Sequence, residues 1–142
     1  MFSAYARLPD SSTRRLDGIE AVRQLWDTPQ AQFWIDLEAP TVDELADLDT
    51  VINLDDLALA DCLAGEQLPR IDEYENYLFA VLYGAFGPPV GAPFEPRKLA
   101  AFLGQRFLIT IHREALRTIN TLRERAQRHG EQVLRDGPDA LF

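Results

Sequence analysis

Asp61 is the residue whose chemical setting most strongly suggests a function. It follows Leu57-Ala58-Leu59-Ala60 on a predicted helix. A carboxylate beside apolar neighbours stays ionised only when a cation or a hydrogen-bond donor accompanies it. Mg²⁺ keeps several of its waters and takes one or two carboxylates, so one aspartate per chain suffices for such an ion. An aspartate that caps its helix or faces solvent fits the pattern as well, and both interpretations stay open.

The other residues that could take part in a reaction or bind a metal are expected to have structural roles. His112 and His129 lie far apart, and neither has a cysteine or second histidine at a metal-site spacing. We expect His112, at the end of a strand, and Cys62, on a helical apolar stripe, to be structural. The glycines at 84, 87 and 91 lack the Gly-Lys-Ser/Thr of a phosphate loop. An enzyme would require the fold to gather His112 or Cys62 with acids from distant segments.

The composition predicts a single soluble domain spanning residues 1–142. Hydrophobic residues make up 46% and charged residues 26% of the chain, as in ordinary globular proteins. No apolar run approaches the length of about 18 residues that a membrane span requires. The single cysteine suits a reducing compartment. The net charge of −9 argues against nucleic-acid binding through phosphates.

The charges are unevenly distributed along the chain. Residues 36–75 contain thirteen acids and one base, Arg70, whereas residues 97–135 contain nine bases and three acids. Such asymmetry is typical of self-association, of a surface that attracts cations, or of two solvated faces. The sequence leaves these three interpretations open.

Hydrophobic spacing predicts interspersed strands and helices. Strands are expected at residues 3–8, 13–16, 33–37, 69–72 and 77–83, with a hairpin formed by 98–103 and 107–111. Helices are expected from residue 18 after an Asp17 cap, after a Thr41–Glu44 capping box, at 54–64 after an Asn53 cap, at 114–129, and as a first turn at 138–142. Residues 84–96, rich in glycine and proline, are expected to be irregular. The fold class is therefore α/β, a mixed sheet sandwiched between helices (α/β/α).

The helix expected at 54–64 carries two apolar stripes. Ala58, Leu59, Cys62 and Leu63 form one, and Leu54, Leu57 and Asp61 form another, roughly opposite. Because one stripe is enough to cover a core, the second predicts a further contact, such as another subunit. We also expect Asp55-Asp56 to complement a helix N-terminus, Tyr74 and Tyr77 to pack within the fold, and Arg117, Arg123, Arg125 and Arg128 to lie on the outer face of the last helix.

Five blocks of this sequence, taken in order, resemble the cytosolic N-terminal domain of CorA-type magnesium transporters. They are WIDL (34–37), LALAD (57–61), PRIDEYENYLF (69–79), FLGQRFLITIHRE (102–114) and DGPDAL (136–141). The resemblance covers residues 33–142. It implies an α/β/α domain on the cytoplasmic side of the cell membrane, assembled as a homopentamer into a funnel. It also implies a full-length protein that continues into a long helix and two membrane spans, the domain's own transmembrane partner.

The resemblance further implies a regulatory Mg²⁺ site between subunits. In the family, an aspartate in the block that matches residues 57–61 binds this ion opposite an aspartate of the neighbouring subunit, and Asp61 holds the matching position. Ala60 replaces a frequent glutamate, and Asp55-Asp56 replace the usual His-Pro. Residues 63–66 are closer to the related ZntB zinc transporters, so Co²⁺, Ni²⁺ and Zn²⁺ are alternative transported ions.

Two functional hypotheses follow. The first is a regulatory domain of a divalent cation transporter that senses cytosolic Mg²⁺ through Asp61 and gates the pore. The alternative is a stand-alone soluble interaction domain that kept the fold without the pore. The sensing hypothesis requires Asp61 to face a neighbouring copy. An Asp61 carboxylate held in the chain's own interior by an arginine would contradict it.

Overall fold

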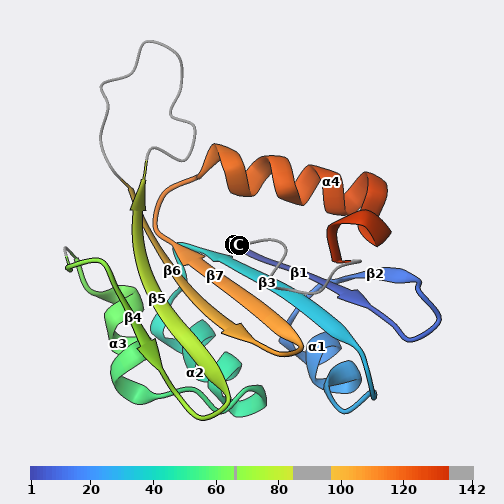
Figure 1. Ribbon diagram of the computed structural model, residues 1–142, viewed down its shortest axis with the longest axis horizontal. Coiled ribbons are helices and arrows are strands. Elements are labelled where there is room, and N and C mark those ends of the chain that lie inside the picture. The colour runs from blue at the N-terminus through green and yellow to red at the C-terminus, as the bar shows by residue number, and fades with distance from the viewer. Residues whose placement is uncertain (66, 85–96, 135–142) are drawn as a thin grey trace.

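A seven-stranded sheet forms the centre of the molecule, in the order β2-β1-β3-β7-β6-β5-β4. The computed structural model describes residues 1–65, 67–84 and 97–134, with side chains up to residue 126. Strands β3 and β7 pair in parallel, and the other neighbouring pairs are antiparallel. Helices α1, α2 and α3 cover one face of the sheet and α4 lies on the other (Figure 1). The predicted α/β/α architecture with a mixed sheet is confirmed.

The elements differ from the predictions mainly at their ends. The strands are β1 (Phe2–Arg7), β2 (Thr13–Leu16), β3 (Gln32–Glu38), β4 (Arg70–Glu73), β5 (Tyr77–Gly84), β6 (Arg97–Gly104) and β7 (Phe107–His112). The helices are α1 (Ile19–Trp26), α2 (Val42–Val51), α3 (Asp56–Leu63) and α4 (Arg117–Leu134). Residues 85–96 of the expected irregular segment and the expected turn at 138–142 lie outside the described residues. None of the helices in the described part of the chain has the length and apolar character needed to cross a bilayer.

One predicted helix cap is confirmed and two are wrong. The Thr41 capping box is confirmed, because Thr41 Oγ1 accepts from Glu44 N (3.1 Å) and Glu44 Oε1 accepts from Thr41 N (3.0 Å). The predicted Asp17 cap is wrong, since Gly18 is the N-cap of α1 and makes no side-chain bond. The predicted Asn53 cap is also wrong. Asp55 caps α3, because its side chain accepts from the backbone of residues 57 and 58.

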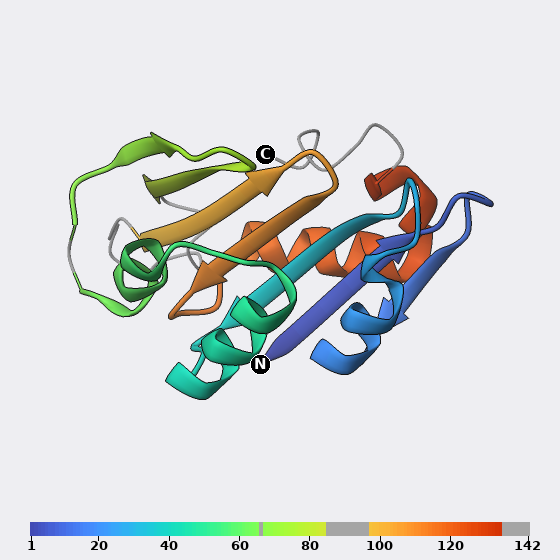
Figure 2. The same ribbon diagram turned by 90° about the horizontal axis from the view of Figure 1, so that it is seen from below.

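Successive side chains along β3 point alternately into the two layers of the core. Phe33, Ile35 and Leu37 point into the cluster beneath α1, α2 and α3, the face seen in Figure 2. Trp34 belongs to the cluster beneath α4. Because successive strand residues face opposite sides, Asp36 points toward α4 as well. Its carboxylate is thereby placed in the interior.

One of the arginines predicted to lie on the outer face of α4 is largely buried. Leu116, just before the helix, and Ile119 are buried, as expected. Arg123, predicted to lie outside, has a side chain that is only 14% exposed and is paired with Asp36. It follows Ile119 by four residues, a spacing that puts both side chains on the same helical face. The predicted outer position is therefore wrong for this arginine.

Gly104, where β6 ends before the turn to β7, is expected to be sensitive to substitution. A Cβ atom at Gly104 would overlap the ring of Phe107, which is 7% exposed and lies 5.6 Å from the ring of Trp26. Because this ring has little room to move, Gly104→Ala is expected to lower the free energy of unfolding by about 1–3 kcal/mol in urea denaturation. Gly65→Ala, where an added methyl meets nothing within 4 Å, is the control, with a change below about 0.5 kcal/mol. Equal effects of the two substitutions would contradict the packing argument.

Candidate functional site

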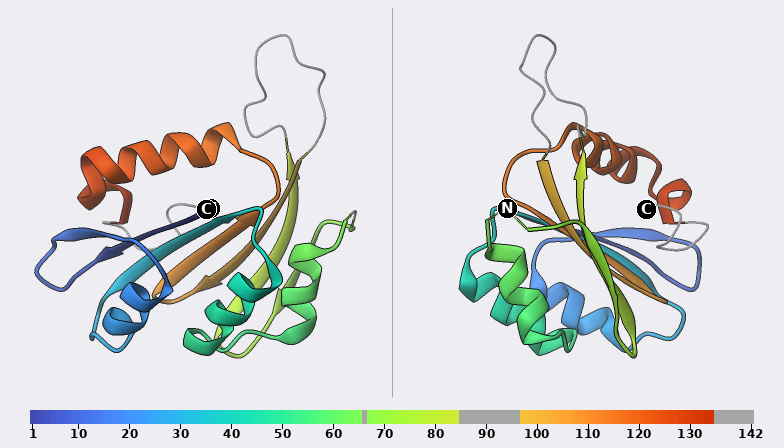
Figure 3. Two further views of the ribbon diagram at one scale, coloured as in Figure 1. Left: turned by 180° about the vertical axis from the view of Figure 1, so that it is seen from behind. Right: turned by 60° about the vertical axis from the view of Figure 1, so that its left-hand side comes forward.

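Asp61 lies in the last turn of α3 and is paired with Arg70 of β4. Helix α3 lies beside the edge of the sheet that ends with β4 (Figure 3). Asp61 Oδ1 accepts a hydrogen bond from Gln67 Nε2 (2.8 Å), and Asp61 Oδ2 is paired with Arg70. Arg70 also donates from Nε to Asp72 Oδ2 (2.9 Å). The Asp61 side chain is 27% exposed. The arginine that would oppose the sensing hypothesis is present, but the carboxylate lies at the surface and not in the interior.

The surroundings keep the Asp61 carboxylate ionised. Partial burial by itself would raise the pKa of Asp61, but the hydrogen bonds from Gln67 and Arg70 and the charges of Arg70 and Lys98 outweigh it. The net effect lowers the pKa below its ordinary value. At neutral pH, Asp61 therefore carries a negative charge that is already compensated from within the chain.

The C-terminal end of α3 receives two further cations. The ammonium of Lys98 on β6 donates to backbone carbonyl oxygens, those of Asp61 (2.5 Å), Ala64 (3.0 Å) and Gly65 (3.5 Å). Arg113, just after β7, donates to the carbonyl of Leu63 (3.0 Å). Positive groups at this end complement the helix dipole and satisfy carbonyls that have no helical partner. Burial lowers the pKa of Lys98, and the charges of Arg113 and Arg70 lower it further.

The N-terminal end of α3 is fixed by two tyrosines. Tyr77 Oη accepts from the Asp55 amide (2.8 Å), and Tyr74 Oη donates to Asp55 Oδ2 (3.3 Å). Their rings stack with centroids 4.9 Å apart, and Tyr77 also meets Phe102 at 5.5 Å. The expected packing of these tyrosines within the fold and the helix N-terminal role of Asp55 are confirmed. As a result, α3 is held at both ends.

A divalent cation would find few oxygen ligands here. Gln67 Oε1 is buried and has no hydrogen-bond donor among the described residues, and it belongs to the amide that contacts Asp61. A carboxylate and an amide oxygen suit Mg²⁺ or Ca²⁺. Among the described residues, however, no group of three or more His, Cys, Asp or Glu side chains converges on a possible metal position. Within the described residues, Asp61 and Gln67 therefore offer a divalent cation two kinds of oxygen ligand and no cluster of further carboxylates beside them.

Comparison with known proteins identifies the family. The family model described as CorA-like Mg²⁺ transporter protein matches residues 29–140. The chain belongs to this CorA-like family. The candidate metal ion transporter YfjQ of Bacillus subtilis (strain 168) is 29% identical over 108 residues, which cover 76% of this chain and 32% of YfjQ. The CorA-like chain thus spans about a third of that relative's length.

Solved structures show the same fold. The soluble domain of CorA from Methanocaldococcus jannaschii matches with a TM-score of 0.67 at 18% identity, covering 94% of this CorA-like chain and 49% of that chain. The ZntB cytoplasmic domain from Vibrio parahaemolyticus RIMD 2210633 matches with a TM-score of 0.64 at 13% identity, covering 89% and 49%. The predicted resemblance to the cytosolic domains of the CorA and ZntB transporters is confirmed at the level of fold.

The second apolar stripe predicted for α3 is reduced to two residues. Leu54 lies before the start of the helix and is only 4% exposed, because its side chain belongs to the core cluster beneath α1, α2 and α3. Leu57 is 75% exposed and precedes Asp61 by one helical turn. The CorA-like domain therefore presents an apolar side chain and a carboxylate on the same exposed face of α3.

Cys62 and His112 do not form a catalytic pair, although both line one hollow of about 270 Å³ together with Glu114. Burial raises the pKa of Cys62 to about 12, so its sulfur stays a thiol, and it lies 3.3 Å from the Ala58 carbonyl oxygen. Both ring nitrogens of His112 are engaged elsewhere. The larger hollow lined by Trp26, Tyr77 and Arg106, about 950 Å³, does not include Asp61 in its lining.

A buried charge network beneath α4 was missed by the sequence analysis. Asp36 is 1% exposed and accepts hydrogen bonds from Thr110 Oγ1 (2.6 Å), His112 Nε2 (2.8 Å) and Arg123 Nη2 (2.7 Å). Trp34 Nε1 donates to Thr110 Oγ1 (3.1 Å). The available signal was an aspartate inside the apolar run of β3, with a threonine and a histidine two residues apart on another strand. From the sequence, Asp36 was counted among the thirteen acids of residues 36–75.

The geometry determines the charge of His112. Its Nδ1 lies 2.7 Å from the Glu114 carbonyl oxygen, which can only accept, and its Nε2 faces the Asp36 carboxylate. Both nitrogens therefore carry hydrogens. Burial by itself would lower the pKa of His112, but the hydrogen bond and charge of Asp36 outweigh it, so the pKa is raised above 6.5.

This raised pKa predicts a pH dependence of stability. A histidine with a raised pKa contributes its full stability below the unfolded value of about 6.5 and loses it as pH rises through the folded value. We expect the free energy of unfolding, measured by urea denaturation, to fall over this window. His112→Gln should remove that contribution and lower stability at pH 6 by about 1–3 kcal/mol. An unchanged pH profile in this variant would contradict a protonated His112.

Proposed function

We propose that this CorA-like domain is the regulatory cytoplasmic part of a divalent cation transporter, and that it senses Mg²⁺ at the interface between neighbouring copies. Family membership supports the transporter context. The observation that carries the sensing role is the ionised, 27% exposed carboxylate of Asp61 on the face of α3 that also exposes Leu57. An apolar side chain beside a charge at the surface is typical of a face that meets another chain.

The proposed mechanism is a shift between pore states. Asp61 and Gln67 supply oxygen atoms from one copy, and the neighbouring copy supplies the rest. An ion bound in this way stabilises the arrangement in which two copies are close together, and it shifts the population only by its difference in affinity between the states. At high cytosolic Mg²⁺ the closed pore is favoured, and at low Mg²⁺ it is released. We propose a homopentamer with its own membrane-spanning part, on the cytoplasmic side of the membrane.

Removing the Asp61 charge tests this function. In the transporter that carries this domain, Asp61→Ala is expected to raise the Mg²⁺ concentration for half-closure by about tenfold or more, because a lost ligand worth about 1.4 kcal/mol changes affinity tenfold. The measurement is Mg²⁺-dependent inhibition of cation flux in proteoliposomes. Asp56→Ala removes an exposed acid from the first turn of the same helix and is the matched control. Closure unchanged in Asp61→Ala, or changed equally in Asp56→Ala, would remove Asp61 from the sensor.

A further inference from the structure

We infer that Arg70 is a tethered competitor of the divalent cation: its guanidinium occupies the Asp61 carboxylate and sets the ion concentration at which the site fills. The inference rests on the proposed function of Asp61 and concerns how that site is regulated. It begins from the ion pair between Asp61 and Arg70, two partly exposed side chains on α3 and β4.

Arg70 and a divalent ion cannot share the carboxylate in its present geometry. Asp61 Oδ2 is taken by Arg70, and Oδ1 accepts from Gln67 Nε2. The oxygen of the same Gln67 amide has no donor among the described residues. A cation that reached this pair of side chains would meet the guanidinium charge first, so binding requires that Arg70 move away. The apparent affinity then falls in proportion to the fraction of chains in which Asp61 is free.

If Arg70 leaves Asp61, two of its present contacts do not depend on Asp61. Its Nε donates to Asp72 Oδ2 at 2.9 Å, and its guanidinium carbon lies 5.5 Å from the centre of the Phe79 ring. Asp72 and Phe79 face each other across β4 and β5, so both contacts belong to the sheet and not to α3. The arginine can therefore release Asp61 without becoming an unpaired charge, which makes the exchange reversible.

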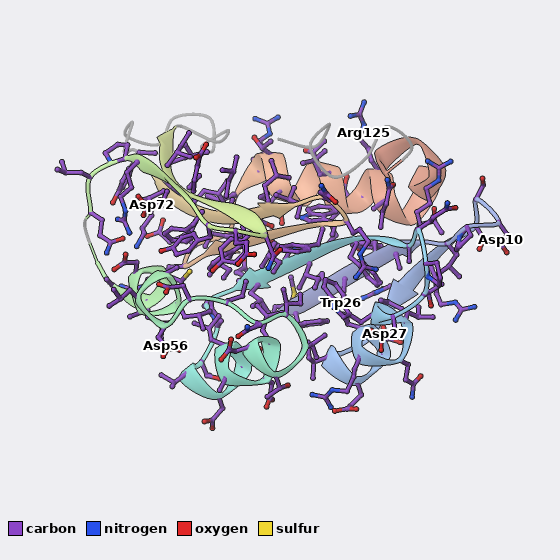
Figure 4. All side chains as sticks on the ribbon, turned by 60° about the horizontal axis from the view of Figure 1, so that its bottom comes forward. Asp10, Trp26, Asp27, Asp56, Asp72 and Arg125 are labelled. Carbon is purple, nitrogen blue, oxygen red and sulfur yellow. The ribbon has the colours of Figure 1, made fainter. Side chains whose placement is uncertain are left out.

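The backbone carbonyl groups at the C-terminal end of α3 keep their cationic partners when Arg70 leaves Asp61. Lys98 contacts the backbone carbonyls of Asp61 and Ala64, and Arg113 contacts that of Leu63. These contacts do not involve the Asp61 side chain. Asp56 lies on the α3 side of the sheet and Arg125 on the α4 side (Figure 4). Exchange of one cation for another is thus confined to the carboxylate.

The test uses Mn²⁺ as the probe and paramagnetic broadening of backbone NMR signals around Asp61 in the 142-residue chain as the readout. Arg70→Gln is expected to lower the Mn²⁺ concentration for half-broadening about fivefold, as for removal of a surface ion pair. Arg113→Gln removes the same charge from the same end of α3 without touching the carboxylate, and it should change the value less than twofold. Asp61→Asn should abolish the local broadening both in the otherwise unchanged chain and in the Arg70→Gln variant.

The outcomes separate this inference from the proposed function. No gain in Arg70→Gln, or an equal gain in Arg113→Gln, would overturn the competition, even if Asp61→Ala still weakened closure of the transporter. A gain confined to Arg70→Gln would support the competition, even if Asp61→Ala left closure unchanged and the sensing role failed. Broadening that persists in Asp61→Asn would show that Mn²⁺ binds elsewhere and would overturn the inference.

Discussion

One buried carboxylate connects α4 to the two central strands of the sheet. Asp36 is 1% exposed, and a charge removed from water is tolerated only with close partners. Its donors come from β7 and α4, and the parallel pairing of β3 with β7 sets Asp36 directly opposite Thr110. Because donors from β7 and from α4 meet at this one carboxylate, the register of the two central strands and the docking of α4 are linked.

The same rule acts on the opposite face of the sheet, with a different consequence. At the end of α3, the Asp61 carboxylate and the backbone carbonyls are compensated by Arg70, Lys98 and Arg113, which come from β4, β6 and the end of β7. There the carboxylate is 27% exposed. Because water and ions can reach this carboxylate, its partner can be exchanged, whereas Asp36 and its partners are enclosed by the fold. Exposure distinguishes a structural charge pair from one suited to regulation.

Errors in the sequence-based predictions came from partners that are distant in sequence. Asn53 and Asp55 both suit an N-cap, and the hydroxyl groups of Tyr74 and Tyr77 meet Asp55 only in the folded chain. Arg123 belongs to a run of arginines that suggested a solvated face, but the charge of Asp36 draws it inward. Asp61 was predicted to need a cation or a hydrogen-bond donor, and the chain itself provides Arg70 and Gln67.

The sequence by itself determined the order of the elements, the Thr41 capping box and the mixed sheet, because periodicity and caps act over a few residues. The family followed from the resemblance of five sequence blocks taken in order. Only the tertiary structure decided which charges meet. Asp36 and Arg123 are 87 residues apart, and Asp36 and His112 are 76 residues apart. Such pairs form where the fold brings strands and helices together. Hydrophobic periodicity and helix caps do not show which distant residues meet there.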